Sequence, residues 1–255
     1  MIDSHCHLNH DRFYANPEKY IQDAAEAGVE AFLVVGYDYK SSLKAVALAG
    51  RFPNVYAAVG IHPSDIKSRG QKDLGEIEKL LSNPKVIGYG EIGLDYYWDK
   101  SEVAQSEQRK YFIDQIDIAN RHHKPIIIHT REAAYDTYKI LSDHTPLYGG
   151  IMHCYSGSAE MVGNYLALGF YISLGGPVTF LNAKTPKEVA KIIPLNRLLI
   201  ETDAPYLSPH PLRGQPNEPK NIIYVCQEVA RLRNQSQQVI DQETTANFKR
   251  LFNLL

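Results

Sequence analysis

Seven side chains that can bind divalent metal ions are spread along the sequence, each close to a short apolar run. Imidazoles and carboxylates are ligands of borderline and hard divalent cations, and they are costly to bury without a partner. If the fold gathers them, a metal centre is the chemistry that they support best. The seven residues are His5, His7, His62, Glu91, His129, His153 and Asp203.

Eight short apolar runs bounded by turn residues predict the strands that must position these side chains. Most runs are continuous and β-branched, which is typical of parallel strands covered by helices. The predicted strands cover residues 1–6, 31–36, 55–61, 86–92, 125–130, 150–155, 170–174 and 198–202. Helical periodicity between them predicts helices over 17–27, 73–81, 108–121, 132–143, 158–168, 185–192 and 218–232, with a last helix reaching Leu255.

This alternation in a chain of 255 residues predicts the α/β class, as a (β/α)8 TIM barrel that forms a single domain over residues 1–255. An open, doubly wound sheet is the alternative. Such a sheet is expected to carry a glycine-rich turn after its first strand, whereas the segment from Asp3 to Leu8 contains no glycine. The barrel is therefore favoured.

The composition excludes several classes of protein. A hydrophobic content of 44% argues against disorder, and 27 basic against 29 acidic residues argue against a polycationic surface for long nucleic acids. No apolar run approaches the length of a membrane span. Three separated cysteines, without a Cys-x-x-Cys pair, suit a reducing compartment. We expect a soluble, cytoplasmic protein without a membrane partner.

In a (β/α)8 barrel the carboxyl ends of all strands meet at one face, where active sites lie. The seven residues fall at or just after these ends, so we expect them to converge. His5 and His7 are two residues apart and project to the same side of their strand, while Cys6 turns to the helices. Alone, these histidines could be hydrogen-bonded core rings, and Glu91 and Asp203 could be capping acids. Together they indicate a metal site.

Four histidines and two carboxylates exceed the needs of one tetrahedral ion, which favours two divalent ions with one bridging carboxylate. Glu91, from the middle of the strand order, is the expected bridge. No lysine stands at the carboxyl end of a predicted strand, so a modified lysine is not expected to take that role. The candidate ions are Mg²⁺, Mn²⁺ and Zn²⁺.

The motifs around these residues resemble the TatD-type metal-dependent deoxyribonucleases, a branch of the amidohydrolase superfamily. The resemblance covers the whole chain. It rests on Ile2-Asp3-Ser4-His5-Cys6-His7-Leu8, Val59-Gly60-Ile61-His62-Pro63, Gly88-Tyr89-Gly90-Glu91-Ile92-Gly93-Leu94-Asp95, Ile128-His129-Thr130-Arg131, Met152-His153-Cys154-Tyr155-Ser156-Gly157 and Glu201-Thr202-Asp203-Ala204-Pro205-Tyr206.

The resemblance implies a (β/α)8 metal-dependent hydrolase that cleaves phosphodiester bonds. It implies metal ligands at His5, His7, Glu91, His129, His153 and Asp203. As a mechanistic hypothesis, bound ions would lower the pKa of a shared water and Asp203 would accept its proton. The hydroxide would then attack phosphorus in line with the ribose oxygen, which leaves as the P–O bond breaks. The expected catalytic residues are Asp203, which accepts the proton, and Glu91, the expected bridging carboxylate.

Two further residues are candidate contacts to the substrate. His62 and Arg131 are expected to bind phosphate oxygens. Arg131 lies two residues after His129, so its side chain projects to the same side of the strand. Glu201 shares the phase of Asp203 but lies one pleat deeper, so we expect it to support a ligand from behind. The rings of Tyr96, Tyr97 and Trp98 can stack on unpaired bases, although packing at the rim is an equally good interpretation.

The leading hypothesis is a deoxyribonuclease that trims single-stranded or frayed DNA ends as a 3′–5′ exonuclease. A small pocket without a basic groove suits a terminus better than the middle of a strand. An alternative is hydrolysis of another ester or amide at the same centre, for example deacylation of an aminoacyl-tRNA. From another class, the chain could be a non-catalytic, metal-stabilised binding module. The sequence leaves the oligomeric state open.

Overall fold

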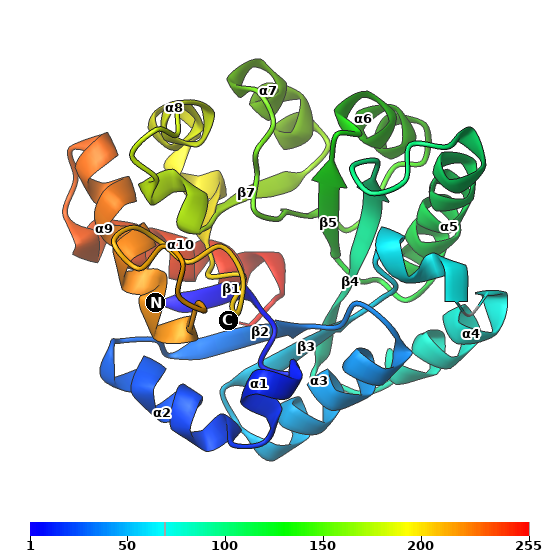
Figure 1. Ribbon diagram of the computed structural model, residues 1–255, viewed down its shortest axis with the longest axis horizontal. Coiled ribbons are helices and arrows are strands. Elements are labelled where there is room, and N and C mark those ends of the chain that lie inside the picture. Colours follow the sequence, from blue (N-terminus) through cyan, green and yellow to red (C-terminus); the bar gives the residue numbers. More distant parts are fainter. Residues whose placement is uncertain (69, 255) are drawn as a thin grey trace.

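Eight parallel strands form the centre of the fold, which a computed structural model describes for residues 1–68 and 70–254 (Figure 1). The strands pair in sequence order. They are β1 (Ile2–Cys6), β2 (Ala31–Val35), β3 (Val55–Val59), β4 (Val86–Asp95), β5 (Ile126–Arg131), β6 (Gly150–Met152), β7 (Phe170–Leu174) and β8 (Leu198–Ile200). Each predicted strand is thus present, and the predicted TIM-barrel class is confirmed.

Hydrogen bonds between β1 and the end of β8 bring the two edges of the sheet together. The backbone N–H of Asp203 donates to the carbonyl of His5, and that of His7 donates to the carbonyl of Ala204, both at 2.9 Å. The hydroxyl of Ser4 adds a bond to the carbonyl of Ile200. The sheet therefore curls into a nearly closed barrel, and its two edges meet beside His5 and Asp203, two of the candidate metal-binding residues.

Helices surround the strands in an outer ring (Figure 1). The α-helices are α1 (Asp11–Tyr14), α2 (Pro17–Glu26), α3 (Tyr39–Arg51), α4 (Gly70–Leu80), α5 (Glu102–Arg121), α6 (Ala134–Asp143), α7 (Ala159–Ala167), α8 (Thr185–Ile192), α9 (Ile222–Arg233) and α10 (Gln237–Leu251). Four short 3-10 helices are η1 (Pro63–Ser68), η2 (Gly176–Thr179), η3 (Leu195–Arg197) and η4 (Pro219–Asn221). Among the described residues, no helix is long and apolar enough to cross a membrane.

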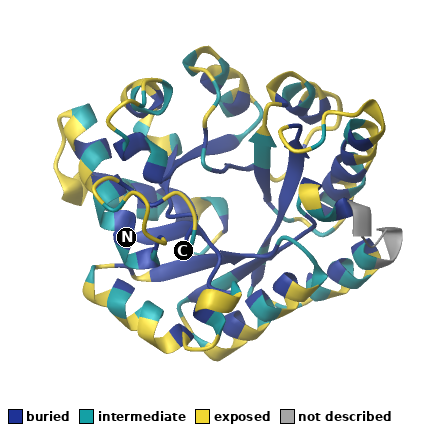
Figure 2. Ribbon diagram, in the orientation of Figure 1, coloured by how far each residue is buried: buried dark blue, intermediate teal, exposed yellow. Residues whose placement is uncertain are grey.

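The alternation of side chains along the strands separates two apolar layers. In β2, Phe32 and Val34 belong to the large cluster between strands and helices, whereas Leu33 and Val35 belong to a smaller cluster inside the barrel. Phe248 of α10 also packs in the inner cluster. In Figure 2 the strands are buried while the outer faces of the helices are exposed. The inner cluster therefore fills the barrel below the site.

Several helix boundaries differ from those predicted. Helix α3 was not predicted, because its buried face consists mainly of small residues, Ser41, Ser42, Ala45 and Ala49, which give a weak apolar signal. Helix α1, of one turn, was also missed. Helix α5 begins at Glu102 rather than at residue 108, since Ser101 caps it by accepting from the N–H of Ala104.

Candidate metal centre

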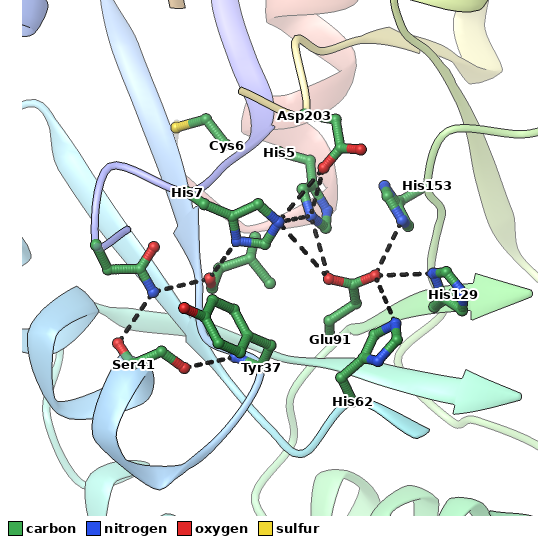
Figure 3. Close-up of polar contacts among 12 residues, drawn as sticks. His5, Cys6, His7, Tyr37, Ser41, His62, Glu91, His129, His153 and Asp203 are labelled. Atoms are coloured by element: carbon green, nitrogen blue, oxygen red, sulfur yellow. Dashed lines mark hydrogen bonds and ion pairs between the residues drawn. The ribbon is translucent and has the colours of Figure 1, made fainter. Parts of the chain in front are cut away.

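The structure brings all seven candidate metal-binding side chains together at the carboxyl end of the barrel (Figure 3). Arg131 lies at the same end, in the lining of the same pocket. His5 is fully buried, and the others line a pocket of about 720 Å³. Its further lining residues are His10, Tyr37, Ser64, Asp65, Asp95, Trp98, Thr130, Cys154, Ser156, Pro177, Tyr206 and Leu207. The predicted convergence of distant residues is therefore present.

Two irregularities in strand pairing lie where ligand candidates enter the site. The register of β1 against β2 shifts between Asp3 and Cys6, and that of β4 against β5 shifts between Tyr89 and Ile92. Such bulges redirect the side chains beside them and are common next to active sites. His5 lies in the first irregularity and Glu91 in the second.

The prediction that Glu91 ends its strand was wrong, because β4 continues to Asp95. Glu91 instead enters the site from the irregular middle of the strand. A Cβ atom on the preceding Gly90 would lie 2.7 Å from both Cβ and the carbonyl oxygen of Ile127. Only glycine allows the two strands to approach so closely at this point.

Glu91 lies between two sets of imidazoles, and each of its oxygens faces one set (Figure 3). Oε2 lies 3.5 Å from Nε2 of His5 and 3.8 Å from Nε2 of His7. Oε1 lies 3.0 Å from Nδ1 of His129 and 3.1 Å from Nε2 of His153. A carboxylate placed in this way can bridge two cations.

Asp203 completes the half of the site that contains His5 and His7. Its Oδ1 lies 3.4 Å from Nε2 of His7 and 3.8 Å from Nε2 of His5. The two Nε2 atoms are 3.3 Å apart. These three residues therefore offer one donor atom each around a common point.

Hydrogen bonds behind three of the rings fix which nitrogen carries the proton. Nδ1 of His7 lies 2.9 Å from the carbonyl of Val35, Nε2 of His129 lies 3.0 Å from Asp95 Oδ2, and Nδ1 of His153 lies 3.1 Å from Glu201 Oε1. Each of these partners is an acceptor, so the outer nitrogen must donate. In the neutral rings, the inner nitrogens then present lone pairs to the centre, as metal-binding histidines do.

His62 has the opposite tautomer. Its Nδ1 accepts the backbone N–H of Ser64 at 3.1 Å, so Nε2, which lies 3.7 Å from Glu91 Oε1, carries the proton of the neutral ring. Burial, followed by the neighbouring His129, lowers the pKa of His62 to about 3. His62 therefore presents a neutral N–H donor to the pocket, which suits an oxygen of a substrate better than a metal ion.

The inner lone pairs face carboxylate oxygens, so either protons or cations must lie between them. Burial opposes a charge on His153, but Glu91 and then Glu201 raise its pKa well above the ordinary value. Burial likewise opposes a charge on Glu91, yet His153 and His62 hold its pKa well below the ordinary range. The buried Nδ1 of His5 has no hydrogen-bond partner among the residues that the structure describes. A divalent cation would satisfy lone pairs and carboxylates together, so the residues present fit a metal.

Asp95 is a residue of the site to which the sequence analysis gave no role. It holds the outer nitrogen of His129, and its Oδ1 accepts the N–H of Tyr97 at 3.0 Å. Asp95 lies four residues after Glu91, and both residues belong to β4. A predicted strand that continued to residue 95 would therefore have placed the two side chains on the same face. His62, Asp95 and His129 also form a third group of close donor atoms, but the proton on Nε2 of His62 makes that group a poorer metal site.

Other histidines lie outside the metal centre. His122 contacts Glu78 at the end of α5, His123 contacts the ring of Tyr148, and His144 caps the end of α6. His10 caps α1 and lines the pocket.

Comparison with known proteins places the chain in a family. Residues 2–253 match the family described as TatD related DNase. The uncharacterized metal-dependent hydrolase YabD of Bacillus subtilis (strain 168) is 44% identical over 255 residues, which are 100% of this chain and 99% of that protein. The uncharacterized metal-dependent hydrolase YcfH of Escherichia coli (strain K12) is 37% identical, over 100% of this chain and 96% of that protein.

A solved structure shares the fold over almost the whole chain. The crystal structure of YjjV, a TatD homologue from Escherichia coli K12, has a TM-score of 0.95 at 31% identity and covers 99% of this chain and 98% of that one. A hydrolase TatD family protein from Entamoeba histolytica shares the fold with a TM-score of 0.82 at 22% identity, over 99% and 97%. The chain therefore belongs to the TatD related DNase family of metal-dependent hydrolases.

Proposed function

We propose that the chain is a deoxyribonuclease that removes nucleotides from single-stranded or frayed DNA ends as a 3′–5′ exonuclease. The observation that carries the proposal is the position of Glu91, whose two oxygens face two separate pairs of imidazoles. This arrangement suits two divalent ions, Mg²⁺, Mn²⁺ or Zn²⁺. The proposed ligands are His5, His7, Glu91, His129, His153 and Asp203.

Bound divalent ions would acidify a water molecule and stabilise negative charge on a phosphate. The residues of the chain supply the remaining parts. Burial opposes the charge of Asp203, but the neighbouring imidazoles of His7 and then His153 keep its pKa below the ordinary value. Asp203 is therefore a carboxylate at neutral pH and can accept a proton. Glu91 holds the two halves of the site together.

Two residues are proposed to bind the substrate. The Nε2–H of His62 is a neutral donor that points into the pocket. The guanidinium of Arg131 makes no hydrogen bond to a residue that the structure describes, and it lines the same pocket. Both groups can donate to phosphate oxygens.

The form of the site supports action on a chain end. A pocket of about 720 Å³ is in the usual range for small-molecule sites, and the formal charge of the chain is −2. The buried ring of ligands suits a terminal nucleotide that enters the pocket, rather than a duplex that lies along a charged groove. The three cysteines are free, which fits the cytoplasm as the proposed location.

The test is degradation of single-stranded DNA labelled at its 5′ end, with Mg²⁺, Mn²⁺, Zn²⁺ or a chelator. We expect a ladder of products that shorten stepwise from the 3′ end and disappear with chelator. The Asp203→Asn variant, loaded with metal, should lose at least about 100-fold in rate, because its side chain cannot accept the proton. Tyr148→Ala, at the opposite end of the barrel, is the control and should retain the rate.

One result would overturn the proposal, and another would overturn the role of Asp203 within it. Full metal occupancy without cleavage of DNA would direct attention to esters or amides, such as aminoacyl-tRNA, as substrates. Wild-type rates in metal-loaded Asp203→Asn would remove that residue from proton transfer.

A further inference from the structure

An exposed aromatic corner stands at the rim of the metal pocket, between the ends of β4 and β5. Trp98, the only tryptophan of the chain, is 72% exposed, and Tyr97 is 41% exposed. Their rings lie at 88° to each other, with centroids 4.8 Å apart. The guanidinium of Arg131 lies 3.6 Å from the centroid of Tyr97 and 5.5 Å from that of Trp98. We call Tyr97, Trp98 and Arg131 the aromatic corner.

Two of the three residues of the aromatic corner line the same cavity as the proposed ligands. Trp98 and Arg131 line the pocket together with Glu91 and His129. Arg131 is two residues beyond His129 on β5, so both side chains project to the same side of the strand. A ligand held at the corner would therefore reach the metal centre without leaving the pocket.

The segment that carries the corner is anchored from below. The side-chain amide of Gln108 bonds both the N–H and the carbonyl of Asp95, at 2.8 and 2.9 Å. Asp95 in turn accepts the N–H of Tyr97, and the hydroxyl of Tyr96 donates to Asp136 at 2.7 Å. The backbone beneath Trp98 is thus fixed, while the indole itself remains exposed.

Packing within the protein does not explain why Trp98 is present at this position, because its indole is largely exposed. A tryptophan that serves the core is highly buried, and a large exposed aromatic surface is typical of a binding site. Arg131 is held against Tyr97, yet its N–H groups have no acceptor among the described residues. The corner therefore offers an exposed indole and a positioned guanidinium whose N–H groups have no acceptor among the described residues.

We infer that the aromatic corner binds the nucleotide next to the scissile phosphate, with the indole of Trp98 stacked on its base and Arg131 donating to its phosphate. The inference rests on the proposed nuclease function and adds to it how the substrate is selected. Aromatic stacking on bases is tolerant of sequence, but it requires a base whose face is free. The corner would therefore select unpaired ends over duplex DNA.

Binding can be measured without hydrolysis, because Trp98 is the sole source of tryptophan fluorescence. The Asp203→Asn protein with Mg²⁺ is titrated with an oligothymidylate of eight nucleotides, and with an abasic oligomer of the same length and charge. We expect the oligothymidylate to quench the emission with saturation, and the abasic oligomer to quench it little. Arg131→Lys, which keeps the charge but loses the planar stack, should weaken binding of both oligomers. Equal quenching by the two oligomers, or none, would overturn the inference.

Kinetics on the active protein provide a second, independent measurement. Trp98→Leu should raise KM for single-stranded DNA by about 5- to 150-fold, the range for loss of one stacked base, with a smaller change in kcat. For the wild type, removing the terminal bases from the substrate should raise KM by a similar factor. For Trp98→Leu, the same removal should raise KM by less than about twofold, because the substitution and the base removal delete the same interaction. Tyr148→Leu, an exposed tyrosine outside the pocket, is the matched control. Independent, additive losses would contradict stacking.

The two measurements separate this inference from the proposed function. Saturable, base-dependent quenching in Asp203→Asn, with no cleavage by the metal-loaded wild type, would support base stacking at the corner and refute the nuclease. Cleavage with an unchanged KM in Trp98→Leu would support the nuclease and refute the corner.

Discussion

Asp95 determines which ring nitrogen of His129 faces Glu91. Its Oδ2 lies 3.0 Å from Nε2 of His129, and Nδ1 of the same ring lies 3.0 Å from Glu91 Oε1. We expect Asp95→Asn to weaken metal binding by about 10- to 100-fold, the usual effect of removing a partner behind a metal ligand. Titration of the metal-free protein by calorimetry measures this change.

Glu201→Gln is the matched substitution behind His153, where Oε1 lies 3.1 Å from Nδ1. It should have an effect of similar size, whereas Asp143→Asn, on the surface beside Lys139, should have none. Unchanged affinity in both Asp95→Asn and Glu201→Gln would contradict the assignment of His129 and His153 as ligands.

The sequence predicted which ligand candidates converge, because residue type and strand position are both visible in it. It did not predict Asp95, because the predicted strand stopped at residue 92 and left Asp95 in a loop. Nor could it predict the proton on Nε2 of His62, which depends on the backbone N–H of Ser64. Hydrogen bonds of this kind depend on local backbone geometry that periodicity does not report.

Helix α5 positions two edges of the site through two glutamines on one face. Gln115 bonds the N–H and the carbonyl of Ile61, at 2.9 and 3.1 Å, directly before His62. Gln115→Met would leave both backbone groups buried without this partner. We expect the free energy of unfolding to fall by about 2–6 kcal/mol, since each of the two unsatisfied buried groups costs roughly 1–3 kcal/mol. Urea denaturation followed by circular dichroism measures the loss.

Gln238→Met, on the exposed surface of α10, is the control and should change stability by less than about 0.5 kcal/mol. Because Ile61 precedes His62, Gln115→Met should also raise KM for DNA. A variant as stable as the wild type would show that water replaces the glutamine.

Strands were easier to predict than the irregularities within them. Each apolar run became a strand, because burial on both faces leaves a continuous apolar signal. The register breaks in β1 and β4 have no such signal, although they lie where His5 and Glu91 enter the site. Helix α3 was missed for a related reason, since its buried small residues resemble a polar segment.

The closed barrel brings together six proposed ligands that come from both edges and the middle of the sheet. β1 and the end of β8 meet through backbone bonds at His5 and Asp203, so the same contacts close the barrel and build one half of the centre. The hydroxyl of Thr202 adds a bond of 2.6 Å to the buried Asp3 beside them. Metal binding and barrel closure should therefore be coupled.

This coupling predicts that divalent ions stabilise the whole fold. A ligand that binds only the folded state at 100 times its dissociation constant adds about 2.7 kcal/mol, and each kcal/mol raises the Tm of a domain of this size by roughly 2–4 °C. Addition of metal to the chelator-treated protein should raise the Tm, measured by far-ultraviolet circular dichroism, by about 5–10 °C. His153→Ala should retain only part of this rise, because it removes one of the rings that face Glu91 Oε1, while Tyr148→Ala should retain all of it. A Tm that does not respond to any of the three ions would contradict a metal centre at the closure of the barrel, since a cation bound between His5 and Asp203 must oppose the opening of β1 from β8.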